Sequence, residues 1–232
     1  MRTLPAVALC SSLLLLAACS ASEEPDTNAA SSDPASVEPE APAVQPETDS
    51  DRAEILESGF GQDGDYTFVT ALVSNTGYVG EFATVVFNVY DQSDALVATE
   101  EQVEGFTSET GTTAIGTQVE TSGFTVGRVE ATLSVSDYGT TSDAVEQLSP
   151  VDGVPDADGG WTFELTNATG SDWVELRVGI VCRDAAGAIV GGGSDFPSLV
   201  PAGGSYLISD AIWQAASPAS CVAYPQLPLE MS

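Results

Sequence analysis

Carboxylates are the only plausible general acids and bases in this sequence. The 232 residues include 35 Asp and Glu and five basic residues, all of them Arg, but neither His nor Lys. This composition excludes a Ser/His/Asp or Cys/His catalytic unit, a His-containing metal site and a Schiff-base lysine. A pair of carboxylates, as in glycoside hydrolysis, is the one enzymatic class that remains. Because the acids are scattered over turns and outward strand positions, and no pair stands out, we expect a protein that is not an enzyme.

Carboxylates also bind hard cations, and the Gly-containing segment around Asp152, Asp156 and Asp158 offers such oxygen ligands. The segment does not fit an EF-hand, because placing Asp156 and Asp158 at loop positions 3 and 5 puts the apolar Val154 and Leu165 at positions 1 and 12. A flexible or weakly ion-braced linker is therefore the favoured interpretation. The three acids remain candidates for a metal site, and no cofactor is expected.

The overall composition limits the partners of the chain. A formal charge of −30 argues against a nucleic acid, because binding to phosphates needs clustered Lys or Arg. A mean hydropathy of +0.08 is too high for a chain that is disordered throughout. The excess of acids is typical either of adaptation to high salt or of repulsion that prevents association. The three tryptophans, Trp161, Trp173 and Trp213, could form a ligand platform, but we expect them to pack in or beside a core.

The first residues have the features of an export signal. Arg2 precedes an apolar run over residues 4–18, which is too short for a membrane-spanning helix. The run leads into Leu-Ala-Ala-Cys at 16–19, which resembles a bacterial lipobox. That resemblance implies that residues 1–18 are removed and that Cys19 is diacylated, so that lipid anchors the protein in a cell membrane or outer membrane, facing the periplasm or the exterior. An ordinary signal peptide with a nearby cleavage site is the alternative.

Residues 19–52 are predicted to be a disordered tether behind the lipidated cysteine. From 20 to 52 the chain holds mainly Pro, Ser, Ala and nine acids, and Val37 and Val44 are its only large aliphatic residues. Such a segment cannot form a core. A flexible chain of about 33 residues spans roughly 30 Å, and charge repulsion extends it further. We expect the tether to hold a folded part away from the membrane, with its charges serving solvation rather than specific binding.

From residue 53 onward the sequence predicts an all-β fold with an internal repeat. Short alternating runs rich in Val, Thr, Phe and Tyr are separated by Gly, Asn and Asp. The segment around Asn75 matches the segment around Asn167 at an offset of 92, and the segment ending at Asp91 matches the one ending at Asp184 at an offset of 93. The two aspartates end strands, so we assign them to turns rather than to catalysis.

The repeat predicts two tandem small β-sandwich modules. They comprise residues 53–140 and 160–232, with residues 141–159 as the linker. Because side chains alternate between the two faces of a strand, the sequence also predicts which of them are buried. The inward positions are Ala83, Val85, Phe87 and Val89 in the first module and Val174, Leu176, Val178, Ile180 and Cys182 in the second, with Trp161, Phe163 and Leu165 on the opposing sheet.

Aligning the two modules with each other also predicts a disulfide. Cys182 takes the place of Val89, and Cys221 takes the place of Val129. The paired positions should face each other either across the sandwich or between neighbouring strands, and an exported protein folds in an oxidising compartment. We therefore expect a bond between Cys182 and Cys221, which would close a loop of 39 residues and stabilise the fold by roughly 3 to 4 kcal/mol. Two free buried thiols are the alternative, and zinc is disfavoured because further soft ligands are lacking.

Residues 87–91, Phe-Asn-Val-Tyr-Asp, resemble the motif that names the FxLYD domain, with Val in place of Leu. The preceding Val-Ser-Asn-Thr-Gly at 73–77 is similar to the strand and Asn-Thr turn that come before that motif in the family. The resemblance covers about residues 53–137 and, more weakly, 158–228, where residues 180–184 keep the Asp but lose Phe and Tyr. It implies an immunoglobulin-like β-sandwich on exported bacterial proteins, often lipoproteins, with no established activity and no catalytic residues to transfer.

These observations favour a non-catalytic, lipid-anchored envelope protein whose modules serve as an interaction or spacer element for an envelope or extracellular protein. A solute- or cation-binding lipoprotein is the alternative, and a carboxylate-based hydrolase comes third. A binding lipoprotein should have a closed pocket of a few hundred Å³ between or within its modules.

Overall fold

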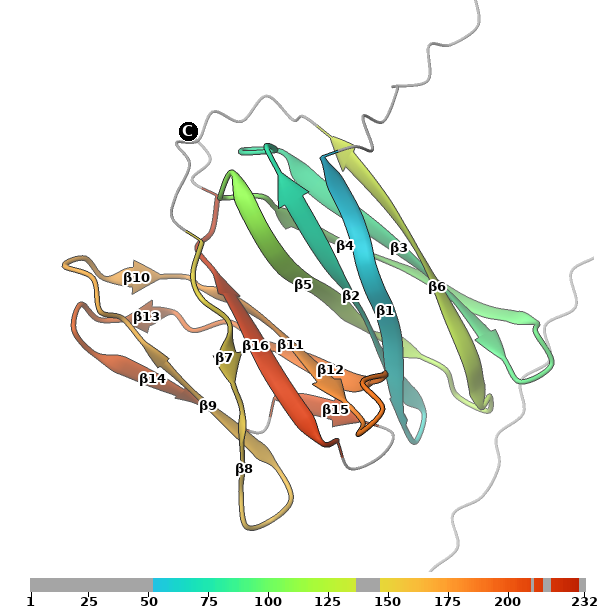
Figure 1. The fold of residues 1–232 in the computed structure, drawn as a ribbon. Coiled ribbons are helices and arrows are strands. Elements are labelled where there is room, and N and C mark those ends of the chain that lie inside the picture. The colour runs from blue at the N-terminus through green and yellow to red at the C-terminus, as the bar shows by residue number, and fades with distance from the viewer. Residues whose placement is uncertain (1–51, 137–146, 210, 215–217, 230–232) are drawn as a thin grey trace, which may run out of the picture. The chain divides into compact units, whose positions relative to one another are not determined.

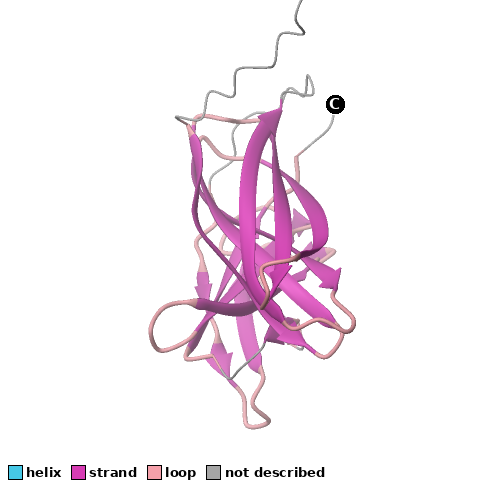
Figure 2. Cartoon of the chain, turned by 90° about the vertical axis from the view of Figure 1, so that its right-hand side faces the viewer, coloured by secondary structure: helices cyan, strands magenta, loops and turns pink. Residues whose placement is uncertain are grey.

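The computed structural model describes residues 52–136, 147–209, 211–214 and 218–229. All of them belong to one of the two units into which the chain divides, Pro46–Ser232. Every regular element in these residues is a β-strand, and Figure 2 shows only strands and loops there. The predicted all-β fold is confirmed. The described residues include no helix that is long and apolar enough to cross a membrane.

Strands β1 to β6 form a first group of two three-stranded antiparallel sheets (Figure 1). In one sheet the order is β1 (Ala53–Asp63), β2 (Tyr66–Thr76) and β5 (Thr110–Glu120), and in the other it is β4 (Leu96–Gly105), β3 (Phe82–Asp91) and β6 (Val126–Ser136). Buried side chains of both sheets, such as Val73 and Phe87, belong to one hydrophobic cluster. The two sheets therefore pack face to face as a sandwich.

The alternation of side chains along β3 assigns its faces as predicted. Ala83, Val85, Phe87 and Val89 have no solvent exposure, whereas the residues between them are half-buried. Burying a large aliphatic or aromatic side chain contributes about 1.5–3 kcal/mol. This apolar stripe is therefore a main contribution to the packing of β3 against the other sheet of the first group.

Strands β7 to β16 form a second group. Its largest sheet has the order β15 (Ile212–Gln214), β12 (Ile189–Asp195), β11 (Arg177–Arg183), β16 (Ser220–Gln226) and β7 (Val151–Asp152). A second sheet has the order β14 (Ser205–Ile208), β9 (Trp161–Thr166) and β8 (Val154–Pro155), and a ribbon pairs β10 (Trp173–Val174) with β13 (Leu199–Val200). Trp161, Phe163 and Leu165 of β9 share a buried cluster with the inward residues of β11, as predicted.

One residue of the predicted inward stripe in the second group is outside the core. Val174 is 52% exposed, whereas Val178, Ile180 and Cys182 are buried. The cause is Glu175, whose φ of 51° ends β10 and interrupts the alternation before β11 begins. The prediction for Val174 was wrong because it assumed one continuous strand.

The predicted linker, residues 141–159, is in part strand. Val151 pairs with β16 as part of β7, and Val154 pairs with β9 as part of β8. The second group of strands therefore begins at Val151. Pairing with two different sheets satisfies backbone N–H and C=O groups of this short segment, which is why it is ordered. Residues 141–146 of the predicted linker lie outside the described residues, as do residues 137–140 of the predicted first module.

A disulfide joins Cys182 and Cys221, and it lies between neighbouring strands. The two residues are direct partners in the pairing of β11 with β16, and their Cα atoms are 4.1 Å apart. Val89 and Val129, which the sequence alignment matches to them, are direct partners in the pairing of β3 with β6. Of the two arrangements that the sequence left open, the one between adjacent strands is observed.

Asp91 and Asp184 build the same turn after β3 and after β11. The Oδ1 atom of each accepts hydrogen bonds from the backbone N–H groups two and four residues further along the chain, at 2.8–3.0 Å. The N–H group of each aspartate donates in turn to the carbonyl four residues further along. The predicted turn role of both residues is confirmed.

Strand β11 is covered on both faces. Val181, on the face opposite to Cys182, is fully buried and forms a third hydrophobic cluster with Leu72 of β2 and Ala114 of β5. Ile189 and Tyr224 pack against this cluster. It therefore joins the first group of strands to the second.

Candidate functional site

A cleft of about 490 Å³ lies where the two groups of strands meet. Strands β2, β4 and β5 line it from the first group, and β11, β12, β15 and β16 line it from the second. Figure 1 shows β5 next to β16 and β11, and contacts between these strands support that view. The volume falls in the range of small-molecule sites, roughly 300–1,000 Å³. Neither group of strands forms the cleft alone.

Four aromatic side chains line the cleft. Phe68 of β2 is buried and Tyr224 of β16 is half-buried, whereas Phe196 and Trp213 are 57% and 38% exposed. Trp213 packs edge-on against Tyr66, with ring centroids 6.4 Å apart and ring planes at 62°. Exposed aromatic rings that are held in this way offer flat apolar faces to a ligand.

An ion pair between the two groups of strands forms part of the cleft wall. Nη1 of Arg177 donates to Oε1 of Glu104 at 3.0 Å, and Nε2 of Gln102 donates to the same oxygen at 3.0 Å. The guanidinium of Arg177 also lies 5.3 Å from the ring centroid of Phe196. Only 12% of the Glu104 side chain is exposed. This burial raises the pKa of the Glu104 carboxyl above its ordinary value, and the nearby Arg177 opposes the rise.

Gln226 forms a second polar connection across the cleft. Its Oε1 accepts a hydrogen bond from Oγ1 of Thr113 at 3.1 Å, and its Nε2 donates to the carbonyl of Gly105 at 3.1 Å. Gln226 and Thr113 are both buried. A buried amide that loses its hydrogen-bond partners destabilises the fold. These two bonds therefore favour one fixed distance between β16 and the strands β4 and β5.

The backbones of the two groups approach each other closely at a glycine. A Cβ atom added to Gly179 of β11 would lie 2.3 Å from the carbonyl oxygen of Ala114 in β5. A similar contact occurs at Gly59 of β1, where an added Cβ would lie 2.5 Å from Cβ of Ile189. Side chains at these two positions would force the groups apart, so glycine is required for the observed packing.

Several polar side chains of the cleft have no partner in the protein. Within the described part of the chain, the side chains of Gln118, Ser194 and Ser209 line the cleft and make no hydrogen bond to another protein group. Each of them both donates and accepts hydrogen bonds. These groups are therefore available to a ligand.

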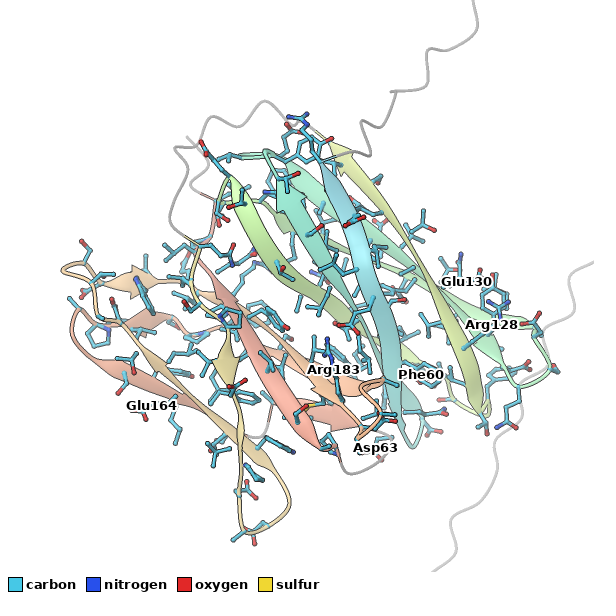
Figure 3. The ribbon with its side chains drawn as sticks, viewed as in Figure 1. Phe60, Asp63, Arg128, Glu130, Glu164 and Arg183 are labelled. Atoms are coloured by element: carbon cyan, nitrogen blue, oxygen red, sulfur yellow. A yellow bond between two sulfur atoms is a disulfide. The ribbon has the colours of Figure 1, made fainter. Side chains whose placement is uncertain are left out.

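The described arginines outside the cleft are engaged elsewhere. Figure 3 labels Arg183 at the end of β11, where it forms an ion pair with Glu57 of β1. Arg128 of β6 lies between Asp94 and Glu130, at 2.5 Å from an oxygen of each. The hydrogen bond to Asp94 is the main reason that the pKa of Arg128 is raised. The first ion pair is partly buried and joins β11 of the second group to β1 of the first, whereas the second lies on the surface of the first group. None of these residues lines the cleft.

A second hollow, of about 370 Å³, lies within the second group of strands. Glu164, labelled in Figure 3, is the ionisable residue among those that line it, and Trp173 is its aromatic one. This hollow contains no ion pair among its lining residues and only one aromatic side chain, whereas the larger cleft has one ion pair and four aromatic side chains. The larger cleft is therefore the stronger candidate for a functional site.

The predicted site residues that the structure describes do not line the larger cleft. Cys182 and Cys221 lie in the core of the second group. Oδ1 of Asp156 accepts hydrogen bonds from the backbone N–H of Asp158 at 2.9 Å and of Gly160 at 2.7 Å, which is the geometry of a turn. No three or more His, Cys, Asp or Glu side chains of the described residues are grouped so that they could hold a metal ion.

The remaining predicted site residues are Asp152 and Cys19. Asp152 lies in β7, where it pairs with Val222 of β16. Cys19, the predicted lipidation site, lies outside the described residues together with the predicted signal peptide.

Three residues of the cleft were not predicted as site residues: Glu104, Arg177 and Gln226. They lie on strands that are far apart in the chain, and no local motif marks them. Trp213 was recognised as a possible platform residue but was expected to pack at a core. The structure places Trp161 in the core and Trp213 at the cleft. Comparison with known proteins found no family model and no curated protein that matches this chain.

Proposed function

We propose that this chain is a non-catalytic, lipid-anchored envelope protein that binds a ligand in the cleft between its two groups of strands. The observation that carries the proposal is the cleft itself, with its exposed aromatic rings and unpartnered polar side chains. The proposal favours the solute-binding alternative over a purely spacing role. The cleft has the volume that was expected for a binding lipoprotein, but it is open to solvent, whereas a closed pocket was expected.

The proposed location outside the cytoplasm rests on the sequence. The lipobox-like residues 16–19 support diacylation of Cys19, and the acidic segment 20–52 supports a tether that keeps the cleft away from the lipid surface. The disulfide between Cys182 and Cys221 agrees with folding in an oxidising compartment.

The proposed lack of catalysis rests on the ionisable groups of the cleft. Glu104 is held by Arg177 and Gln102, and one oxygen of Asp195 accepts the backbone N–H of Phe196 at 2.7 Å. A carboxylate pair for hydrolysis needs one group that donates a proton and one that is free to attack or to activate water. The engagement of Glu104 argues against that role.

For the architecture, we propose two duplicated modules of the immunoglobulin-like type. Support comes from positions that correspond at the offsets of the sequence repeat. Asn75 and Asn167 are both buried, and the Nδ2 atom of each donates to two backbone carbonyls. Asp94 and Gly187, which occupy the same position in the matching turns, both have positive φ angles, of 67° and 90°.

A second candidate function is docking to a partner protein through the second group of strands. The ribbon of β10 and β13 exposes Val174 and Leu199, which are direct partners and are 52% and 48% exposed. An exposed apolar pair of this kind is suited to a protein contact. It is smaller than the cleft and lacks its polar groups, so we rank it second.

A ligand screen with a blocked cleft tests the proposal. The test protein is the chain from residue 19 onward with Cys19→Ser, and the screen measures its melting temperature with saccharides, amino acids, amines, carboxylic acids and short peptides. At least one class should raise the melting temperature by about 2 °C or more when present well above its Kd. Ser194→Trp, which places a large ring in the cleft, should abolish the shift.

Thr132→Trp is the matched control, because Thr132 is exposed on β6 and does not line the cleft. This variant should keep the full shift. If no class shifts the melting temperature, or if Ser194→Trp responds like Thr132→Trp, the cleft is not a binding site.

A further inference from the structure

We infer that the cleft takes a neutral, hydroxyl-rich ligand of the saccharide class. The inference rests on the proposed function and specifies its ligand. It follows from three properties of the cleft, which are its charge, its unpartnered polar groups and its aromatic rings.

The charge of the protein and of the cleft disfavours an anion. The chain carries a formal charge of −30, which repels anionic ligands at long range. Among the residues that line the cleft, Arg177 is the one cation, and it already pairs with Glu104. An anion would have to compete with that buried carboxylate for the guanidinium.

The same groups disfavour a simple cation as the preferred ligand. Glu104 is neutralised by Arg177, so Asp195 is the one described carboxylate of the cleft without an ion-pair partner, and a backbone N–H already occupies one of its oxygens. The other polar groups of the cleft are amides and hydroxyls, which donate hydrogen bonds as well as accept them. An ammonium group donates hydrogen bonds but accepts none, so the N–H and O–H donors of these amides and hydroxyls would remain unpaired.

The unpartnered side chains match a ligand that carries many hydroxyls. Gln118 lies on β5, Ser194 lies on β12, and Ser209 follows β14, so these groups approach the cleft from both of its walls. A hydroxyl both donates and accepts a hydrogen bond, as each of these side chains does. A ligand with several hydroxyls can therefore replace the solvent at all of them without leaving a group unpaired.

The aromatic rings match the apolar faces of sugar rings. Trp213 and Phe196 both line the cleft and keep 38% and 57% of their surface exposed. Trp213 is supported by Tyr66, and Phe196 lies beside the guanidinium of Arg177. Rings held in place in this way contribute contact area at a low cost in conformational entropy. Together with the fixed contact at Gly179, they make a largely preformed site.

Titration with matched saccharides tests the inference. The probes are neutral tetrasaccharides of glucose, galactose and N-acetylglucosamine, a galacturonic acid tetramer of equal size that carries carboxylates, and tetramethylammonium. Binding to the Cys19→Ser chain is measured by calorimetry at 50 and 500 mM NaCl. At least one neutral tetrasaccharide should bind with a Kd below about 1 mM, and that Kd should change by less than about twofold with salt, because no net charge is neutralised.

Two variants connect the binding to the proposed contacts. Trp213→Ala should weaken binding of the neutral probe by about tenfold or more, and Trp213→Phe should restore most of it because a ring face remains. Gln118→Ala should weaken binding by about three- to tenfold through the loss of one hydrogen bond. Thr132→Ala on β6 is the control and should leave the Kd unchanged.

The possible outcomes separate the two proposals. Salt-insensitive binding of a neutral tetrasaccharide, lost in Trp213→Ala, supports both. Binding of tetramethylammonium or of the galacturonic acid tetramer in preference to every neutral probe overturns the saccharide inference but leaves a cleft that binds ligands. Absence of binding by all five probes overturns the saccharide inference, and the broader screen with Ser194→Trp then decides the fate of the proposed function.

Discussion

Glu104 is the residue whose environment gives the cleft a pH dependence. Its carboxyl is largely shielded from solvent between the two groups of strands, and Arg177 supplies the compensating charge. Burial dominates, and it raises the pKa of the carboxyl above the ordinary value of 4.5. The folded chain therefore binds this proton more tightly than the unfolded chain does. The stability that the protonated carboxyl contributes is full at low pH and is lost as the pH rises through the folded pKa.

Replacement of Glu104 by Gln tests this assignment. At pH 7 the free energy of unfolding of Glu104→Gln should equal that of the wild type or exceed it by up to about 1 kcal/mol, because the amide removes a buried charge and keeps an oxygen for Arg177, whose own side chain is 44% exposed and stays hydrated. The difference should vanish as the pH falls through the folded pKa, where the wild-type carboxyl is also neutral. Urea unfolding at pH 7 and at pH 4 measures both values.

Glu130→Gln is the control for this prediction. Glu130 also pairs with an arginine, Arg128, but it is 55% exposed. Exposed ion pairs contribute little, so this change should alter stability by less than about 1 kcal/mol. A Glu104→Gln variant that is clearly less stable than the wild type at pH 7 would show that the attraction of Arg177 outweighs the cost of burial.

At the scale of elements, the pairing of β11 with β16 repeats the pairing of β3 with β6. Cys182 and Cys221 are direct partners in one, and Val89 and Val129 are direct partners in the other. The first pair of strands shows that two valines fit this position of an antiparallel sheet. The disulfide therefore adds a covalent constraint at a place where apolar packing alone already suffices for pairing.

The double variant Cys182→Val and Cys221→Val measures that constraint. We expect it to fold with the same strands and to lose roughly 3 to 4 kcal/mol of unfolding free energy, because the open chain of 39 residues gains entropy when it unfolds. Urea unfolding with and without dithiothreitol gives the value. The reductant should destabilise the wild type and leave the variant unchanged. Equal stability of variant and oxidised wild type would contradict a stabilising role of the bond.

At the scale of the whole described body, the cleft exists because two groups of strands lie close together. Gly179 of β11 faces the backbone of Ala114 in β5, and the buried cluster around Val181 continues that contact. The amide of Gln226 and the ion pair of Arg177 hold the same two walls. This combination of backbone, apolar and polar contacts fixes the width of the cleft.

Replacement of Gly179 by Val tests the role of the close approach. The new side chain would collide with a backbone carbonyl, which cannot move aside as a side chain can, so we expect a loss of at least about 2 kcal/mol in unfolding free energy. Hydrogen exchange of the β5 and β11 amides should become faster in the same variant. Gly170→Val is the matched control, since an added Cβ there meets no atom within 4 Å.

The two glycine variants have distinguishable outcomes. Gly170→Val should stay within about 0.5 kcal/mol of the wild type, as surface changes generally do. If Gly179→Val is equally stable and still binds the ligand of the cleft, the contact between β5 and β11 does not set the geometry of the site.

Local signals in the sequence were enough to determine the all-β class, the inward face of β3 and the turns at Asp91 and Asp184. Each depends on residues that are close in the chain, through the alternation of side chains or through hydrogen bonds to groups two and four residues away. The disulfide was also predictable, because the predicted repeat converts a distant pairing into a comparison of two local segments. Val174 shows the limit of this reasoning, since a single positive φ at Glu175 interrupts the pattern.

Only the tertiary structure decided where the candidate site lies. Glu104 and Arg177 are 73 residues apart, and Thr113 and Gln226 are 113 apart, so no motif connects them. These residues come together only because a sheet of the first group packs against a sheet of the second. Each sheet already makes its backbone hydrogen bonds within its own group. That packing is fixed by shape, by the absence of a side chain at Gly179 and by the burial of Val181, and these are properties of surfaces rather than of sequence patterns.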